Sequence, residues 1–302
     1  MSKSIFHKKA IIALLFITIL WSLSFIFSSS MMHHKVSSEI LLFSRFGLGA
    51  LVLFIINFKN IIKMSKYDLL GGLLVGLSVL FAIYFQNVGF MMTSVSKIAF
   101  ISSMNIVFIP FLAYFINKSK IRKRHLCGLF FAVLGVCFLS LNFNDLATIN
   151  MGDLFALLSA LGFAMQVVLI KKFASKVDPA NLTFIHAIVV SLGGFLITTL
   201  NKGDIGIAFN KDNLISLLYL SIIAMAFCYS IQAWASKYVG EVLTSILIST
   251  QAIFGSAFDV MIFKTPITFQ LIIGAILMAI ALYVLMAPIK YLPIIRLIYK
   301  RT

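Results

Sequence analysis

The stretch AIIALLFITILWSLSFIFS, residues 10–28, contains no charged side chain. A helix needs about 20 apolar residues to cross the hydrocarbon core of a bilayer, which is about 30 Å thick. The stretch is longer than the apolar region of a typical signal peptide, has no A-x-A-like cleavage site after it, and leads directly into a second apolar run. We therefore expect a membrane-spanning helix that is retained.

The same length criterion predicts nine further spans along the chain. They fall at 38–56, 69–90, 95–117, 125–141, 152–171, 180–200, 213–235, 243–263 and 269–287. The composition agrees, because 61% of the residues are hydrophobic and only 11% are charged, against about a quarter charged in soluble domains. The sequence predicts an all-α integral membrane protein with ten transmembrane helices.

The net charge of +16 would suggest nucleic-acid binding in a soluble chain. Here the position of each Lys and Arg relative to the spans is more informative. With a cytoplasmic N-terminus, 19 of the 25 basic residues fall in cytoplasmic segments, five fall outside, and Arg45 lies within a span. Because cytoplasmic loops of membrane proteins carry an excess of Lys and Arg, we expect both termini in the cytoplasm and an inner-membrane location. No nucleic-acid partner is implied.

The chain also contains a weak internal repeat. A shift of 146 residues places Gln86 on Gln232, Asn105 on Gln251, Lys118 on Lys264 and Gly128 on Gly274. Each unit holds five predicted helices, and an odd number makes the second unit enter the membrane from the opposite side. Such inverted repeats are typical of secondary transporters. We expect a cytoplasmic N-terminus at 1–9, five-helix repeats at 10–145 and 150–288, and a cytoplasmic tail at 289–302.

Four stretches resemble a known pattern. They are ILWSLSF (19–25), SRF (44–46), FQNVGFMMTSVSKIAFISSMNIVFIPFLAYF (85–115) and TSILISTQAIFGSAFDVMIFKTPIT (244–268). Their order on ten helices resembles that of bacterial EamA-type members of the drug/metabolite transporter superfamily. The resemblance implies two inverted five-helix repeats around a central cavity. It also implies alternating access for amino acids, nucleoside-like or cofactor-like metabolites, or drugs.

Two positions depart from the resembled pattern. Gln251 stands where many relatives carry a Glu, and Phe263-Lys264 stands where they carry Gly-Glu. A proton-coupling role of those Glu residues therefore cannot be transferred to this chain.

Arg45 and Asp259 are charged residues that lie well inside predicted spans, where a charge is costly and suggests function. Arg45 and Asp259 both lie in the outer half of the membrane, so their side chains could meet. One interpretation is a structural ion pair or two side chains that extend to the interface. The other is a gate, in which Arg45 binds a substrate carboxylate. Arg45 coincides with an Arg that recurs in the resembled family.

Polar and aromatic residues near the middle of the spans are the other candidates for a substrate site. Asn105 and Gln251 either bond a neighbouring helix or line a cavity. Trp21 is far from the membrane interface, so it either forms a cavity wall or packs in the interior. Tyr84, Tyr229 and Gln166 offer hydrogen-bonding groups at similar depths. His186 either titrates near neutral pH or packs in the interior, as a lone histidine more often does.

The combined prediction is a secondary transporter for a small metabolite, working as a proton-coupled carrier or an exchanger. Its expected partners are the small-molecule substrate and the lipid bilayer, and a homodimer is left open. We expect no cofactor, no metal site and no enzymatic activity, since nucleotide-binding and hydrolase motifs are absent from the sequence. The alternatives are a channel-like facilitator and a membrane-embedded enzyme of lipid metabolism.

Overall fold

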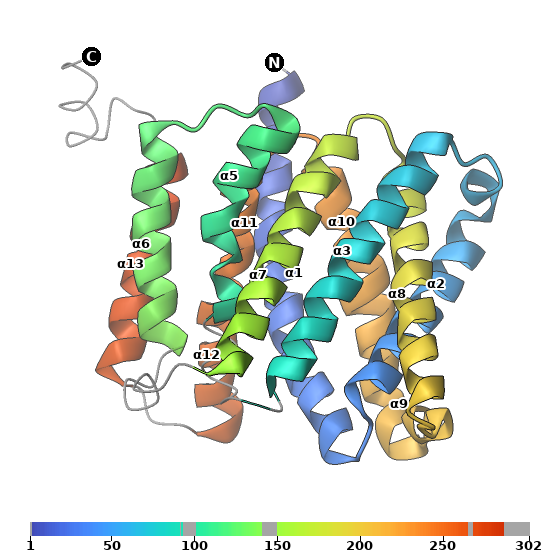
Figure 1. Ribbon diagram of the computed structural model, residues 1–302. Helices are drawn as coiled ribbons and strands as arrows, with labels where there is room; N and C mark the ends of the chain where they lie inside the picture. The colour runs from blue at the N-terminus through green and yellow to red at the C-terminus, as the bar shows by residue number, and fades with distance from the viewer. Residues whose placement is uncertain (1, 91, 93–100, 141–149, 265–267, 287–302) are drawn as a thin grey trace, which may run out of the picture.

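Helices account for nearly all of the residues that the computed structural model describes, which are 2–90, 92, 101–140, 150–264 and 268–286. Ten helical segments within these ranges cross the molecule in alternating directions (Figure 1). The predicted all-α fold with ten spans is confirmed. Seven of the segments are long and apolar enough to span a membrane by length and composition alone.

The two halves of the chain contribute five crossings each. The first half comprises α1 (Ser2–His33), α2 (Ser38–Ile61), α3 (Lys66–Phe90), a fourth crossing that contains α5 (Asn105–Asn117), and α6 (Lys123–Ser140). The second half comprises α7 (Met151–Phe173), α8 (Pro179–Leu200), a composite of α9 (Lys211–Leu218), η3 (Tyr219–Phe227) and α10 (Cys228–Ala235), the pair α11 (Glu241–Ser249) and α12 (Gln251–Phe263), and α13 (Phe269–Met286). A short 3-10 helix, η2 (Ile205–Phe209), precedes α9. The N-terminus and the end of α13 lie on the same face (Figure 1).

Local polar residues define where several helices begin. Asn150 and Asp153 form a capping box at the start of α7. Asp178 caps α8, where Pro179 occupies the first turn and needs no partner for its missing N–H. The backbone N–H of Asp178 also donates to Oδ1 of the buried Asp68 at 2.9 Å, which joins the start of α3 to the start of α8.

The fourth and ninth crossings are interrupted at equivalent positions. Met104 has ψ −1° and Thr250 has ψ −12°, and each N–H donates to the carbonyl three residues earlier instead of four. After the interruptions, α5 and α12 have the same length and both end at a lysine in the left-handed conformation, Lys118 and Lys264. These pairs are 146 residues apart, which is the shift found in the sequence. The repeat is therefore visible in the backbone.

The eighth crossing contains a nine-residue π-helix, η3, between α9 and α10. Such widened turns are rare and are often found at functional sites. The sequence predicted one span over 213–235, and the structure gives one composite helix there with this local change.

The extensive helix contacts join the two halves instead of lying within either half. α3 packs on α7 and α8, α2 packs on α8, α6 packs on α13, and α1 packs on η3, α10 and α12. Each of these pairs has one member from each half. The halves are consequently interleaved, and neither can form its main contacts alone.

Small residues allow the closest of these contacts. A Cβ atom added at Gly72 would lie 2.5 Å from the Cβ of Ile185, and one added at Gly76 would lie 2.7 Å from the Cβ of Val189. Membrane helices gain little from the hydrophobic effect, so such close approach of backbones supplies much of their association. Gly72 and Gly76 are one helical turn apart on α3 and fix its distance from α8.

Candidate functional site

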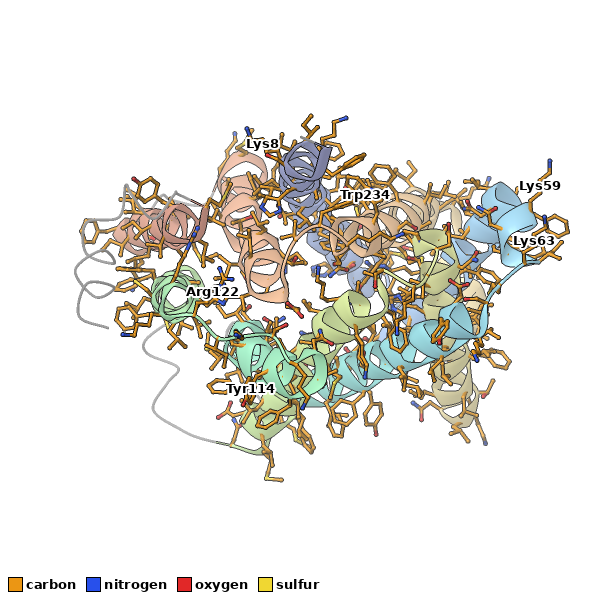
Figure 2. The ribbon with its side chains drawn as sticks, turned by 90° about the horizontal axis from the view of Figure 1, so that it is seen from above. Lys8, Lys59, Lys63, Tyr114, Arg122 and Trp234 are labelled. Atoms are coloured by element: carbon orange, nitrogen blue, oxygen red, sulfur yellow. The ribbon has the colours of Figure 1, made fainter. Side chains whose placement is uncertain are left out.

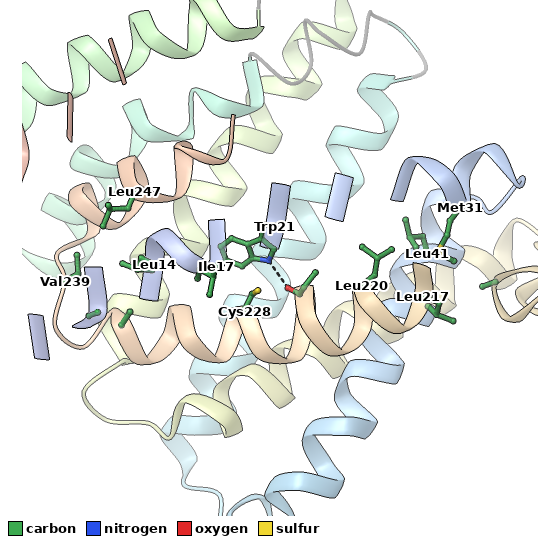
Figure 3. Packing of buried hydrophobic residues seen from close by; sticks show 14 of the residues in the cluster. Leu14, Ile17, Trp21, Met31, Leu41, Leu217, Leu220, Cys228, Val239 and Leu247 are labelled. Carbon is green, nitrogen blue, oxygen red and sulfur yellow. Dashed lines mark hydrogen bonds between the residues drawn. The ribbon is translucent and has the colours of Figure 1, made fainter. Parts of the chain in front are cut away.

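Trp21 connects the middle of α1 to the π-helix. Its side chain is 8% exposed, and its indole N–H donates to the carbonyl of Ala224 at 2.7 Å (Figure 3). In the reverse direction, the hydroxyl of Tyr219 donates to the carbonyl of Leu20 at 2.9 Å. The structure thus fixes the orientation of Trp21 by a hydrogen bond as well as by packing.

Four rings from four helices meet next to this bond. Tyr229 contacts Trp21 edge to face at a centroid distance of 5.2 Å, and it contacts His186 in the same way at 4.9 Å. Phe46 lies 5.6 Å from His186 and 6.2 Å from Tyr229. We call Trp21, Phe46, His186 and Tyr229 the aromatic cluster. It joins α1 and α2 of the first half to α8 and α10 of the second.

Arg45 brings a positive charge to the aromatic cluster. Its guanidinium carbon lies 5.5 Å from the centre of the Phe46 ring. Its Nε is buried and has no hydrogen-bond partner among the residues that the structure describes. Arg45 as a whole is half-buried, and a cation there that lacks a full set of partners is costly, which favours a ligand for it.

Two further buried polar atoms, one in the aromatic cluster and one on α10 a turn after Tyr229, also lack partners within the described ranges. They are Nε2 of His186 and Oε1 of Gln232. His186 is 1% exposed and Gln232 is 2% exposed, so bulk solvent does not replace the missing bonds. Buried polar groups are normally paired, so these two atoms have hydrogen-bonding capacity left for a polar ligand.

The interruption of the ninth crossing is braced by α1, within one turn of Trp21. Ser22 Oγ donates to the backbone carbonyl of Gln251 at 2.9 Å, and Thr18 Oγ1 lies 3.4 Å from Thr250 Oγ1. The side chain of Gln251 is half-buried, and its amide makes no hydrogen bond to a residue in the described part of the chain. The same holds for Asn105 at the start of α5. α1 therefore contacts both the aromatic cluster and one of the two interruptions.

The remaining predicted residues are placed as follows. Gln166 is buried on α7, at 5% exposure, with no hydrogen bond to a described residue. Tyr84 is 45% exposed and lies on the same side of α3 as Leu73 and Leu77, opposite the side that packs on α7 and α8. Tyr84 therefore faces away from the contacts between the two halves and does not belong to the candidate site. The backbone of Asp259 belongs to α12, but its side chain lies outside the described residues, so its pairing with Arg45 stays a prediction.

The structure brings together Trp21, Arg45 and Tyr229, which are three of the site residues predicted from the sequence. It adds Phe46, His186 and Gln232. His186 was interpreted from the sequence as a packing residue, because a lone histidine carries no spacing signal. Gln232 had a signal, since it is the repeat partner of Gln86.

A model of the EamA-like transporter family matches residues 8–141 and 150–287. The chain belongs to the EamA-like transporter family. It is a multi-pass membrane transporter, and the resemblance to the drug/metabolite transporter superfamily is confirmed. The two matched segments correspond to the two halves described above.

Individual proteins are also similar to the chain. An uncharacterized transporter of Archaeoglobus fulgidus is 25% identical over 223 residues, which cover 73% of this chain and 70% of that protein. A protein known from a crystal structure superposes with a TM-score of 0.79 at 15% identity, covering 92% of this chain and 96% of that one. The second likeness shows that the fold is shared.

Proposed function

We propose that this EamA-like transporter is a secondary carrier of a small polar metabolite in the cell inner membrane. It works by alternating access, as a proton-coupled carrier or an exchanger, with both termini in the cytoplasm. The substrate classes considered are amino acids, nucleoside-like or cofactor-like compounds, and drugs. Family membership supports transport itself, and structural features support alternating access and a polar substrate.

The matched interruptions at Met104 and Thr250 carry the proposal. Two halves of opposite orientation hold the same interrupted helix, so exchanging the conformations of the halves would open the molecule to the other side. Interrupted helices in transporters lie at binding sites near the bilayer midplane. Asn105 and Gln251 begin the helices that follow the interruptions, and their half-buried side-chain amides make no hydrogen bond to a described residue.

The chemistry around Arg45 supports a polar, partly aromatic substrate. A guanidinium pairs with a carboxylate through two parallel hydrogen bonds. The rings of Trp21 and Tyr229 offer faces and edges for a substrate ring or cation. His186 Nε2 and Gln232 Oε1 supply further hydrogen-bonding capacity. An amphipathic carboxylate with a ring or an amino group fits this combination best.

Transport by purified protein in liposomes tests the proposal. A panel of labelled amino acids and nucleosides would be assayed for uptake and efflux, without ATP and with or without a proton gradient. We expect saturable flux that the double variant Asn105→Ala, Gln251→Ala reduces at least tenfold. Gln270→Ala, which removes an exposed amide on α13, is the matched control and should transport normally.

Three outcomes would contradict the proposal. Flux that does not saturate would indicate a channel. Formation of a chemically altered product would indicate an enzyme. Unchanged flux in the correctly inserted double variant would remove the interruptions from the substrate path.

A further inference from the structure

A cavity of about 510 Å³ lies between helix ends on the face that carries the N-terminus. Its walls come from α1, α5, α6, α11 and α13, together with the connection from α5 to α6. This volume is in the range of about 300–1,000 Å³ that holds an organic ligand. The cavity is distinct from the aromatic cluster, none of whose four residues lines it.

Cationic side chains from three parts of the chain line this cavity. Lys8 comes from α1, Lys120 and Arg122 from the connection, and Arg124 from the start of α6. Glu241 is the one carboxylate among the lining residues. An excess of Lys and Arg on the cytoplasmic face would suffice for orientation anywhere on that face. Orientation does not require four of them to converge on one concave space.

The connection between α5 and α6 is held in a defined conformation. Glu241 is 7% exposed, and its Oε1 accepts hydrogen bonds from Asn117 Nδ2 at 2.7 Å and Ser119 Oγ at 3.1 Å. Lys118 turns the chain with φ 56°, after which the N–H of Ser119 donates to the carbonyl of Ala113 at 3.1 Å. The carboxylate therefore anchors the connection that carries Lys120 and Arg122.

The side chains of Lys8, Lys120 and Arg122 are available to a ligand. None of the three makes a hydrogen bond or an ion pair with a residue in the described part of the chain. Arg122 lies between α5, α6 and α11 when the molecule is viewed from this face (Figure 2). The rest of the lining is largely apolar and includes Ile11, Val242 and Leu285. The cavity thus combines unneutralised positive charge with an apolar wall.

We propose that this cavity binds a phosphate ester, with the phosphate among Lys8, Lys120 and Arg122 and the organic part against the apolar wall. Arginine binds phosphate oxygens in a bidentate manner, and lysine adds a compact charge. The ester is either a soluble metabolite or the headgroup of an anionic phospholipid, since basic pockets between helices on the cytoplasmic side bind such headgroups. The proposal does not depend on the identity of the transported substrate.

Binding to the full-length protein tests the proposal and separates the two sources. The protein would be placed in nanodiscs of phosphatidylcholine and titrated with glycerol 3-phosphate by calorimetry. In a second arm, retention of phosphatidylglycerol would be measured by native mass spectrometry. The test variant is Lys120→Gln, Arg122→Gln. The matched control is Lys59→Gln, Lys63→Gln, which removes two charges at the far edge of the same face (Figure 2).

We expect the test variant to weaken binding about tenfold or more, while the control binds normally and Lys120→Arg, Arg122→Lys largely retains affinity. Loss of glycerol 3-phosphate binding identifies a soluble ester, and loss of phosphatidylglycerol alone identifies a lipid. Absence of binding in both arms, or an equal loss in test and control variants, would overturn the proposal. If the test variant does not fold, Lys8→Gln on α1 replaces it with the same expected direction.

Discussion

The hydrogen bond from Trp21 to Ala224 gives one side chain two functions. Its ring forms a wall of the aromatic cluster, and its N–H holds the π-helix. Because the hydrogen bond fixes the orientation of the Trp21 indole, the ring presents the same face to each ligand. Mutations of Trp21 should therefore affect stability and transport together.

Replacing Trp21 by Phe keeps an aromatic ring but removes the indole hydrogen bond to the carbonyl of Ala224. We expect a loss of about 1–3 kcal/mol in stability and a weaker apparent substrate affinity. Thermal unfolding in detergent and transport kinetics in liposomes would measure the two effects. Trp234→Phe is the control, because Trp234 is half-buried beside Tyr238 and its indole bonds no described residue.

Arg45→Met separates the two interpretations of the buried cation. If Arg45 binds a substrate anion and has no structural partner, the variant should lose transport. Its free energy of unfolding should rise by about 1–4 kcal/mol, because an apolar residue replaces an incompletely paired charge. If Arg45 forms a structural pair with Asp259, the variant should instead lose stability. A fall in the unfolding temperature would therefore refute the substrate role as we describe it.

At the scale of elements, Gly76 tests how closely α3 must approach α8. An alanine there would place its Cβ 2.7 Å from the Cβ of Val189 and 3.1 Å from the carbonyl of His186. We expect Gly76→Ala to lower the free energy of unfolding by about 1–3 kcal/mol. We also expect it to reduce transport, because a displaced α8 would move His186. Gly255→Ala on α12 meets nothing within 4 Å and should be neutral or slightly stabilising. Equal stability of the two variants would show that α8 can move away freely.

The number of helices could be predicted from the sequence, but their interruptions could not. Ten apolar runs of sufficient length are enough to count spans, because the bilayer fixes the length that a helix needs. Met104 and Thr250 carry no such signal, since neither is Gly or Pro. The interruption at Thr250 is stabilised by Ser22, which is more than 200 residues away in sequence and identifiable only in the folded chain.

The candidate site was predictable in part for a similar reason. Trp21 and Arg45 are residue types that are unusual inside a membrane span, so each can be recognised from the sequence alone. Phe46 is one of 30 phenylalanines in the chain, and the SRF stretch (44–46) that contains it does not indicate which other rings it contacts. Its role follows from contacts with His186 and Tyr229 on other helices.

At the scale of the whole molecule, orientation in the membrane can be tested by labelling. Single cysteines would be placed at Arg122 and at Lys202, which lie at opposite ends of the helices, in a background without the three native cysteines. We expect a membrane-impermeant maleimide to label the Lys202→Cys variant in intact cells. The Arg122→Cys variant should react only after the membrane is opened. The reverse pattern would invert the proposed topology.

The interleaving of the halves also has a consequence for biosynthesis. Helices α1, α2, α3 and α6 find their main neighbours among helices that the ribosome makes later. At about 5–20 residues per second, the first five crossings wait on the order of ten seconds in the bilayer before those neighbours arrive. During this interval their glycine-lined surfaces face lipid or other newly made helices. Protection by an insertion chaperone is needed most at this stage.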